Sequence, residues 1–373
     1  MNNKKITFVI STLAGGGAEG VCVNVANGLV ASGWSVDLVI LHTKEATYLK
    51  RLDPRIHLVV LGVDNARHAP IPLLKYVRKY QPQQMLVFNY ELSVILVMLR
   101  SMFGFKTKIL ARNINTFSKN TNQVTGFWQR RIIRPLINHF YCKVDHVINQ
   151  CQDMRTDLLS VFPQLESKSN VIYNPVANHV EAYAAANDLS QQTKQDYFLC
   201  VGRLEQQKAF HYAIEAFSKI AQRYPSLRLK IVGQGSLESD LKQLANDRKV
   251  LDRVDFEGFQ SDMIPYYVHA KATLLTSLYE GFPNVLVEST TLGTPVIAFD
   301  CQSGPREIIL PGINGYLVEY QSIEGLVDAC DAFLAGAISS EQVRESASRY
   351  ATKQIVKEYE TVLGCPPFEP SVK

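Results

Sequence analysis

The sequence predicts an α/β protein built from two doubly wound parallel-sheet domains. Short apolar runs, such as residues 6–10, are continuous rather than alternating, as expected of strands buried on both faces. Between most of these runs, apolar residues recur at helical spacing, and this alternation favours a parallel sheet covered by helices. The pattern stops in a polar stretch and then begins again, so the 373 residues divide into two domains of ordinary size.

The composition is typical of a globular protein from a reducing compartment. Hydrophobic residues make up 46% of the chain and charged residues 20%. The net charge of +4 is too small to favour nucleic acid as a partner. The seven cysteines are odd in number and form no CxxC pair, which favours a cytoplasmic location. The first residues lack a signal-peptide pattern, and the longest apolar stretch, residues 92–99, is too short to span a bilayer.

The first domain is expected to open with a βαβ unit around a glycine-rich turn. A strand at residues 6–10 leads into Gly15, Gly16 and Gly17, a helix follows, and a second strand covers residues 36–41. The segment GGGAEG matches the fingerprint G-x-G-x-x-G, which would place a pyrophosphate at the helix N-terminus. The second strand, however, does not end in the acidic residue that would bind a nicotinamide ribose. A nicotinamide-dependent oxidoreductase is therefore kept only as an alternative.

A basic amphipathic segment lies at residues 127–143, among further expected strands of the first domain. Its cations Arg130, Arg131 and Arg134 alternate with apolar side chains. Such a surface could lie on anionic lipid headgroups or bind a lipid diphosphate. A helix that covers its own domain and exposes a solvated basic face is the commoner explanation of such a pattern. The further strands are expected at residues 57–61, 85–88, 108–111, 144–149 and 170–173.

The polar stretch that separates the two halves sets the expected domain boundaries. Residues 178–195 lack apolar periodicity and are interpreted as a linker. The N-terminal domain then covers residues 1–177 and the C-terminal domain residues 196–350. A final helical pattern at about residues 351–363 is expected to pack back on the N-terminal domain.

The C-terminal domain opens with a second βαβ unit that carries two cations. A strand at residues 197–201 is followed by the segment VGRLEQQK, which places Arg203 on the turn and Lys208 near the start of a helix. Both can converge on the carboxyl end of the strand, where open α/β sheets bind their ligands. Two cations there could neutralise a departing diphosphate, or they could be ordinary exposed side chains.

The segment EGFPNVLVE, residues 280–288, carries the most informative spacing in the chain. Pro283 is favoured at the first position of a helix, so the next backbone N–H groups would point at an anion, and Gly281 would let it approach. Glu280 and Glu288 bracket this anion site. Carboxylates beside a phosphate serve as acceptors for neutral hydroxyls, so we expect Glu280 to bind a sugar and Glu288 a ribose. A helix start with a solvated glutamate is the alternative. The N–H groups in question belong to Asn284, Val285 and Leu286.

These segments together resemble a known enzyme family. The chain resembles the family 4 glycosyltransferases of the GT-B architecture, in which two Rossmann-like domains face each other across a cleft. The features that carry the resemblance occur in order along most of the chain. They are STLAGGGAE, VGRLEQQK, EGFPNVLVE, GTPVIAFDCQSGPREI and GINGYLV.

The resemblance implies a role for each candidate site residue. Arg203, Lys208 and Glu280 would be catalytic, the two cations on the donor diphosphate and Glu280 on the sugar ring. Phe259 would lie at the base and Glu288 at the ribose. The other donor-binding residues would be Gly16, Gly281, Phe282, Pro283, Asn284, Val285 and Leu286. The acceptor and sugar side would be formed by Gly15, Gly17, Glu19, Arg112 and Asn113, the last two standing where many relatives carry a histidine.

The resemblance also implies a reaction. Such enzymes transfer a sugar with retention of configuration and need no metal, and the sequence contains no Asp-x-Asp metal motif. The expected donor is a UDP-N-acetylhexosamine or UDP-hexose. The expected acceptor is a polyprenyl-diphosphate-linked saccharide of bacterial glycan, O-antigen or capsule assembly. No cofactor is expected, and the enzyme would be cytoplasmic or peripheral on the cytoplasmic face of the membrane. Two more hypotheses stay open, a sugar-nucleotide epimerase of the same fold and a non-catalytic scaffold.

Overall fold

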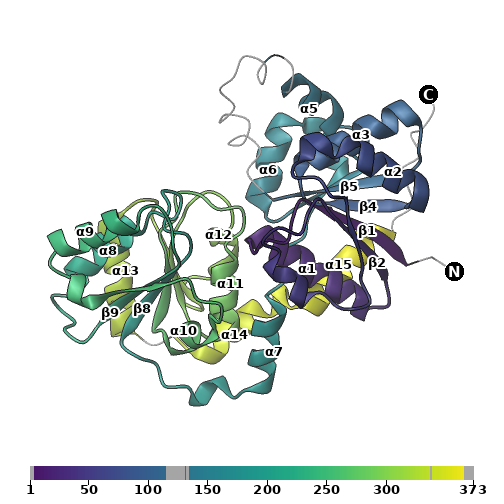
Figure 1. The fold of residues 1–373 in the computed structure, drawn as a ribbon. Coiled ribbons are helices and arrows are strands. Elements are labelled where there is room, and N and C mark those ends of the chain that lie inside the picture. Colours follow the sequence, from purple (N-terminus) through teal and green to yellow (C-terminus); the bar gives the residue numbers. More distant parts are fainter. Residues whose placement is uncertain (1–3, 115–130, 132–133, 337, 365–373) are drawn as a thin grey trace. The chain divides into compact units, whose positions relative to one another are not determined.

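A computed structural model describes residues 4–114, 131, 134–336 and 338–364, and the chain divides into two compact units (Figure 1). Unit 1 consists of Met1–Pro175 together with Thr352–Lys373. Unit 2 consists of Val176–Ala351. Each unit is built on its own parallel sheet, so the predicted α/β fold class is confirmed.

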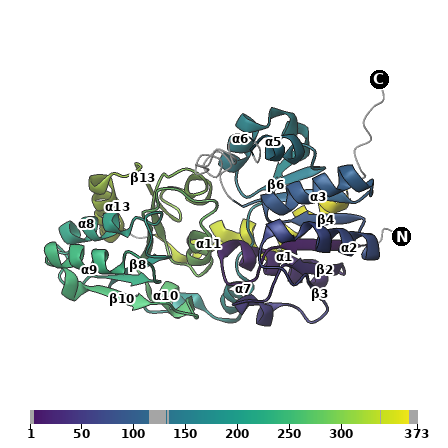
Figure 2. The ribbon, with the colours of Figure 1, turned by 45° about the horizontal axis from the view of Figure 1, so that its top comes forward.

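Unit 1 contains a seven-stranded parallel sheet with the order β3-β2-β1-β4-β5-β6-β7. This order runs from β3 at one edge past β2 and β4 to β6 in Figure 2. The direction of winding reverses between β1 and β4, which is where open α/β sheets place their ligands. The strands are β1 (Lys5–Ile10), β2 (Ser35–Ile40), β3 (His57–Val60), β4 (Gln84–Val87), β5 (Lys108–Asn113), β6 (His146–Asn149) and β7 (Ser169–Val171).

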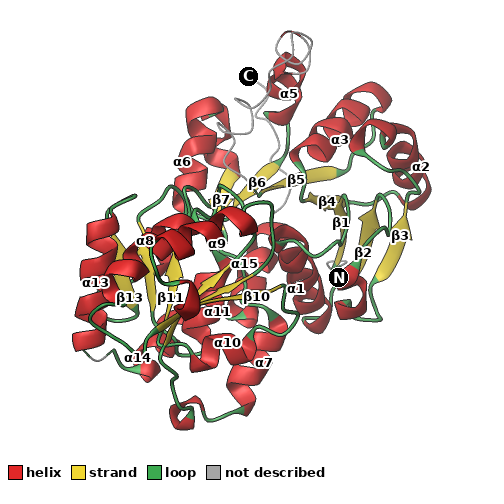
Figure 3. Ribbon diagram, turned by 60° about the vertical axis from the view of Figure 1, so that its left-hand side comes forward, coloured by secondary structure: helices red, strands yellow, loops and turns green. Residues whose placement is uncertain are grey.

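Both faces of this sheet are buried, and the side chains of β1 show why the apolar run is continuous. Ile6, Phe8 and Ile10 lie in one hydrophobic core, and Val9 lies in another. Alternate residues of a strand point to opposite faces, so a strand between two helical layers needs apolar residues at nearly every position. Figure 3 shows helices on either side of the strands.

The helices of unit 1 include one from the C-terminal end of the chain. Helix α15 packs against α1 (Figures 1 and 3), and its Ile355, Val356 and Tyr359 belong to the same core as Ile6. The α-helices are α1 (Gly17–Ala31), α2 (Pro70–Tyr80), α3 (Tyr90–Phe103), α5 (Arg134–Tyr141), α6 (Gln152–Val161) and α15 (Thr352–Gly364). The short 3₁₀ helices are η1 (Thr47–Arg51), η2 (Ala66–His68) and η4 (Pro163–Lys168).

Unit 2 contains a six-stranded parallel sheet with the order β10-β9-β8-β11-β12-β13. Strand β8 lies beside β11, so their carboxyl ends meet at one place on the sheet edge. The strands are β8 (Tyr197–Val201), β9 (Arg228–Val232), β10 (Val254–Gly258), β11 (Ala272–Leu275), β12 (Val296–Phe299) and β13 (Gly315–Val318).

Helices cover both faces of the second sheet as well. The α-helices are α7 (Asn178–Ala186), α8 (Phe210–Ile220), α9 (Glu238–Asp247), α10 (Ile264–His269), α11 (Asn284–Thr291), α12 (Pro305–Ile308), α13 (Ile323–Ala335) and α14 (Ser340–Ala347). The 3₁₀ helices are η5 (Leu189–Gln191), η6 (Leu251–Arg253) and η7 (Ser348–Tyr350).

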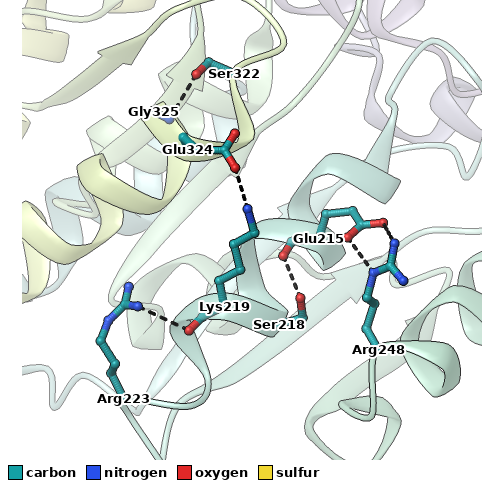
Figure 4. A network of polar contacts seen from close by, with 8 residues as sticks. All are labelled: Glu215, Ser218, Lys219, Arg223, Arg248, Ser322, Glu324 and Gly325. Carbon is teal, nitrogen blue, oxygen red and sulfur yellow. Dashed lines mark hydrogen bonds and ion pairs between the residues drawn. The ribbon is translucent and has the colours of Figure 1, made fainter.

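Surface ion pairs hold α8, the helix that follows the Arg203–Lys208 segment. Glu215 accepts two hydrogen bonds of 2.6 Å from Arg248, and Lys219 Nζ lies 2.5 Å from Glu324 on α13 (Figure 4). These pairs are exposed to solvent, so each adds little stability. They nevertheless tie α8 to the end of α9 and the start of α13.

The structure differs from the sequence expectation at the predicted linker. The stretch 178–195, interpreted as a linker, contains α7 and η5 and belongs to unit 2. Its alanine-rich segment forms a helix because it packs against α11 rather than because of any strong periodicity. Helix α5 begins at Arg134 and accommodates Pro135 in its first turn. Among the described helices, none is long and apolar enough to cross a membrane.

Candidate active site

The segment that carries Lys208 folds tightly over the neighbouring turn of the sheet. Gly233 follows β9, and a Cβ atom there would lie 1.9 Å from the carbonyl oxygen of Gly202. Gly233 also has φ +141° and Gly202 has φ +152°, conformations that side chains disfavour. The backbone at Gly202 therefore lies directly against the turn that follows β9, at the start of the segment that leads from β8 to Lys208.

Lys208 and Glu280 form the central contact of the site. Lys208 Nζ lies 2.7 Å from Glu280 Oε1, and the two side chains are only 16% and 7% exposed. The hydroxyl of Ser277 donates to the same oxygen over 2.6 Å. One carboxylate oxygen of Glu280 thus receives two charge-assisted hydrogen bonds, which fix the orientation of the group.

Three further hydrogen bonds join the segment after β11 to the Lys208 segment. Thr276 Oγ1 donates to the carbonyl of Lys208 over 3.1 Å, and the N–H of Leu278 donates to the carbonyl of Gln207 over 2.8 Å. Gln207 Nε2 in turn donates to the carbonyl of Tyr279 over 3.0 Å. Two segments 72 residues apart in sequence therefore form one rigid unit at the adjacent ends of β8 and β11.

Arg203 lies on the same strand end but is exposed, unlike Lys208. Its neighbour Glu205 accepts hydrogen bonds from Ser236 N at 2.9 Å and Ser236 Oγ at 2.8 Å. These bonds, and to a smaller extent the charge of Arg203, lower the pKa of Glu205. The structure thus places both predicted cations at the carboxyl edge of the sheet. Lys208 is paired with Glu280, whereas Arg203 is exposed to solvent.

Helix α11 begins one residue later than the sequence predicts. Pro283 is the N-cap, and the N–H groups of Asn284 and Leu286 donate to the carbonyls of Phe282 and Pro283 at 2.9 Å. Of the three N–H groups that were predicted to be free to bind an anion, those of Asn284 and Leu286 are therefore already used at the start of the helix, and the prediction is wrong for these two. Phe282 is buried, and its ring packs edge-on against Tyr350 with a centroid distance of 5.8 Å.

Glu288 lies one turn from the end of α11 and contacts a tyrosine that no sequence motif predicts. Tyr267 OH donates to Glu288 Oε2 over 3.0 Å. Tyr267 is fully buried, and burial, followed by the charge of Glu288, raises the pKa of its hydroxyl well above the usual value. Ser277 was missed at the sequence level as well. Neither residue has a distinctive motif, and only the folded contacts reveal them.

Two more side chains mark the borders of the site. Phe259 follows the end of β10 and is 69% exposed, so its ring is available to a ligand. Cys301 is buried after β12, and burial, followed by the charge of Glu280, raises the pKa of its thiol to about 12. The thiol is therefore protonated at neutral pH and acts as a small apolar group near Glu280.

In unit 1, the glycine-rich turn is exposed at the N-terminus of α1. Gly15 and Gly16 precede the helix, and Gly17 is its first residue. A Cβ atom at Gly16 would lie 2.4 Å from Glu19 Oε2, so the carboxylate of Glu19 folds back over the turn. An acidic group in the first turn favours the helix dipole, but it also stands where an anion would approach.

Arg112 and Asn113 were expected on the sugar side, but their side chains are buried in unit 1. Arg112 donates to Tyr359 OH of α15 and to Asn174 Oδ1. Asn113 Nδ2 donates to Asn149 Oδ1 over 3.2 Å. Burial lowers the pKa of Arg112, and Tyr359 partly offsets this effect. Both residues lie at the carboxyl end of β5, as predicted, yet they bind the protein's own polar groups.

The basic segment lies only partly within the described residues. Arg130 is outside them, Arg131 is exposed, and Arg134 is the first residue of α5. Within the described residues, no group of three or more His, Cys, Asp or Glu side chains is arranged to bind a metal ion.

Comparisons with known proteins identify the family. The family model "Glycosyltransferase Family 4" matches residues 15–178, and "Glycosyl transferases group 1" matches residues 184–354. The chain belongs to the glycosyltransferases. Both matches agree with the family 4 resemblance, and neither is a model of a nicotinamide-dependent oxidoreductase.

Similar proteins support the same assignment for this glycosyltransferase. It is 25% identical to the amylovoran biosynthesis glycosyltransferase AmsD of Erwinia amylovora, over 93% of this chain and 96% of that protein. It is also 25% identical to the N-acetylgalactosamine-N,N'-diacetylbacillosaminyl-diphospho-undecaprenol 4-alpha-N-acetylgalactosaminyltransferase of Campylobacter jejuni, over 85% and 86% of the two chains.

The solved structures show the fold. The crystal structure of Anabaena HepE in complex with UDP matches with a TM-score of 0.77 at 17% identity, over 96% of this chain and 99% of that one. The glycosyltransferase therefore has the GT-B fold, as the sequence predicts.

Proposed function

We propose that this glycosyltransferase transfers a hexosyl or N-acetylhexosaminyl group from a UDP-sugar to a polyprenyl-diphosphate-linked saccharide in bacterial polysaccharide assembly. The observation that carries the proposal is the Lys208–Glu280–Ser277 arrangement at the carboxyl ends of β8 and β11. The AmsD relative supports a role in polysaccharide assembly, and the undecaprenol-linked substrate in the name of the Campylobacter relative supports the acceptor class.

The donor site follows from the charges on this edge of unit 2. Glu280 Oε1 accepts from Lys208 and Ser277, whereas Oε2 has no hydrogen-bond partner among the described residues. That oxygen can accept from a sugar hydroxyl while Lys208 contacts the adjacent diphosphate. Glu288 would accept from the ribose, and Phe259 would stack on the base. UDP is favoured because HepE is described in complex with UDP.

In the proposed reaction, the main catalytic task falls to the two cations. The bond between the anomeric carbon and the diphosphate oxygen breaks, and the acceptor oxygen bonds to the same carbon on the same face. The proton of the acceptor hydroxyl passes to the leaving diphosphate. Negative charge grows on that diphosphate in the transition state, and Lys208 and Arg203 would stabilise it without a metal ion.

A membrane surface is part of the proposal because the acceptor would be lipid-linked. Arg130, Arg131 and Arg134 would contact anionic headgroups on the cytoplasmic face. We expect the protein to float with vesicles that contain anionic lipid and to lose at least half of this binding when the three arginines become glutamines. Equal flotation of both proteins would contradict the membrane role, but it would not bear on the proposed donor site.

The transfer reaction itself tests the proposal. We expect UDP release to depend on a polyprenyl-diphosphate saccharide, to continue in the presence of EDTA, and to give a product whose anomeric configuration by NMR matches that of the donor. Conversion of the UDP-sugar to its epimer without any acceptor would indicate an epimerase instead. An inverted product would contradict retention.

A further inference from the structure

Helix α10 brings a buried hydroxyl to the carboxylate of Glu288. Tyr267 lies in the last turn of this six-residue helix and donates to Glu288 Oε2 over 3.0 Å. Burial and the nearby carboxylate raise the pKa of Tyr267 well above its usual value, so the hydroxyl keeps its proton at neutral pH. Tyr267 can therefore serve as a permanent hydrogen-bond donor to Glu288.

The helix that carries Tyr267 is held at all four of its terminal carbonyls. A helix end leaves its last four carbonyls without partners inside the helix. Here each of these carbonyls accepts a hydrogen bond from a residue of unit 2 outside α10. The donors, in the order of Tyr266, Tyr267, Val268 and His269, are Tyr197 OH at 2.7 Å, Thr294 Oγ1 at 2.6 Å, Lys194 Nζ at 2.8 Å and Gln195 N at 2.7 Å.

Lys194 strengthens this end of the helix. Its ammonium group donates to Thr294 Oγ1 over 2.6 Å as well as to the carbonyl of Val268, and burial lowers its pKa to about 8. A cation at a helix C-terminus also stabilises the helix dipole. The network Lys194–Thr294–Tyr267–Glu288 thus links a rigid helix end to a carboxylate of the proposed donor site.

We infer that Tyr267 is a positioning residue that fixes the carboxylate of Glu288 in the orientation that accepts the ribose hydroxyls of the donor. The inference rests on the proposed function, because it gives Glu288 the ribose. A carboxylate whose orientation is already fixed in the free enzyme loses little conformational entropy when the ligand binds, so the ligand binds more tightly. Ribose recognition in this enzyme therefore depends on a residue that does not touch the nucleotide.

The inference predicts a selective loss in Tyr267→Phe. We expect the wild type to bind UDP about tenfold more tightly than 2′,3′-dideoxy-UDP, because the loss of hydrogen bonds to a charged group weakens binding by at least about this factor. Tyr267→Phe binds UDP about five- to tenfold more weakly, and its affinity for 2′,3′-dideoxy-UDP is unchanged. The KM for the donor rises by a similar factor and kcat changes by less than about twofold, because the ribose is remote from the reacting bond. Calorimetric titration and steady-state kinetics measure these quantities.

Tyr197→Phe is the matched control. It removes a hydroxyl that also holds α10 but that, among the residues that the structure describes, bonds only to the carbonyl of Tyr266. This variant should melt at a lower temperature and still distinguish UDP from the dideoxy analogue. In the Glu288→Ala background, Tyr267→Phe should cause no further loss of UDP affinity, which a general loosening of the helix would not explain. If Tyr267→Phe fails to fold, Thr294→Val is the substitute. It removes the hydroxyl that lies between Lys194 Nζ and the carbonyl of Tyr267, keeps the hydroxyl of Tyr267, and should show a smaller loss of the same discrimination.

The outcomes separate the inference from the proposed function. Full discrimination in Tyr267→Phe, or in Thr294→Val where that variant replaces it, overturns the positioning role alone. A wild type that binds the two nucleotides equally well, or that binds neither, overturns the assignment of Glu288 to the ribose of a UDP-sugar, and the inference with it.

Discussion

Lys208→Met is expected to lower kcat/KM for the donor sugar by about a thousandfold in a protein that still folds. Removal of one preorganised group that stabilises transition-state charge typically has an effect of this size. Lys208 is the less exposed of the two cations of the site, and its Nζ lies 2.7 Å from Glu280 Oε1. Initial rates of UDP release at saturating acceptor measure the effect.

The same substitution also removes the partner of a buried carboxylate, so stability must be controlled. Breaking a buried ion pair from one side costs about 3–5 kcal/mol. The double variant Lys208→Met with Glu280→Gln removes both charges and should recover much of this stability without recovering activity. Lys219→Met breaks an exposed pair on α8 and should keep full activity (Figure 4). Activity of Lys208→Met within tenfold of wild type would contradict the role of this cation.

Arg112→Ala is expected to destabilise unit 1 by about 3–5 kcal/mol, the range for large buried side chains replaced by alanine. Arg112 is buried and donates to Tyr359 OH of α15 and to Asn174 Oδ1. Its loss leaves a cavity and two buried polar groups without their donor, each of which adds a penalty. Thermal unfolding measures the change, and hydrogen exchange should show that the amides of α15 lose protection first.

Arg55→Ala is the control for this prediction. Arg55 is an exposed arginine of unit 1 that pairs with Asp53 two residues away, so its removal should leave the melting temperature nearly unchanged. An Arg112→Ala variant as stable as Arg55→Ala would show that the guanidinium does not hold α15 in place.

Most of the fold could be predicted because it depends on local patterns. Continuous apolar runs such as that of β1 identify strands buried on both faces, and helical spacing between them identifies the covering layers. The stretch 178–195 was misread because α7 has a weak apolar face and forms where it packs on α11. Tertiary packing of this kind leaves little trace in the sequence.

The site was predictable where a motif carried it and unpredictable where only tertiary contacts did. Lys208 and Glu280 stand in recognisable segments, and the structure joins them across 72 residues. Ser277 and Tyr267 belong to no motif that was used. Arg112 was assigned to the sugar side by the resemblance, because it stands where many relatives carry a histidine. Residues two apart in a strand lie on the same face of the sheet, and Leu110 belongs to the core that α15 covers. This spacing was the signal that the side chain of Arg112 points inward.

The most direct test of the central claim is a nucleotide-binding panel on the wild type and Lys208→Met. Thermal unfolding would be followed with saturating UDP, GDP, ADP or NADH, since a ligand that binds only the folded state raises the melting temperature. The account predicts an upward shift with UDP alone that is lost in Lys208→Met. A shift with NADH alone, or a UDP shift of equal size in the variant, would contradict it.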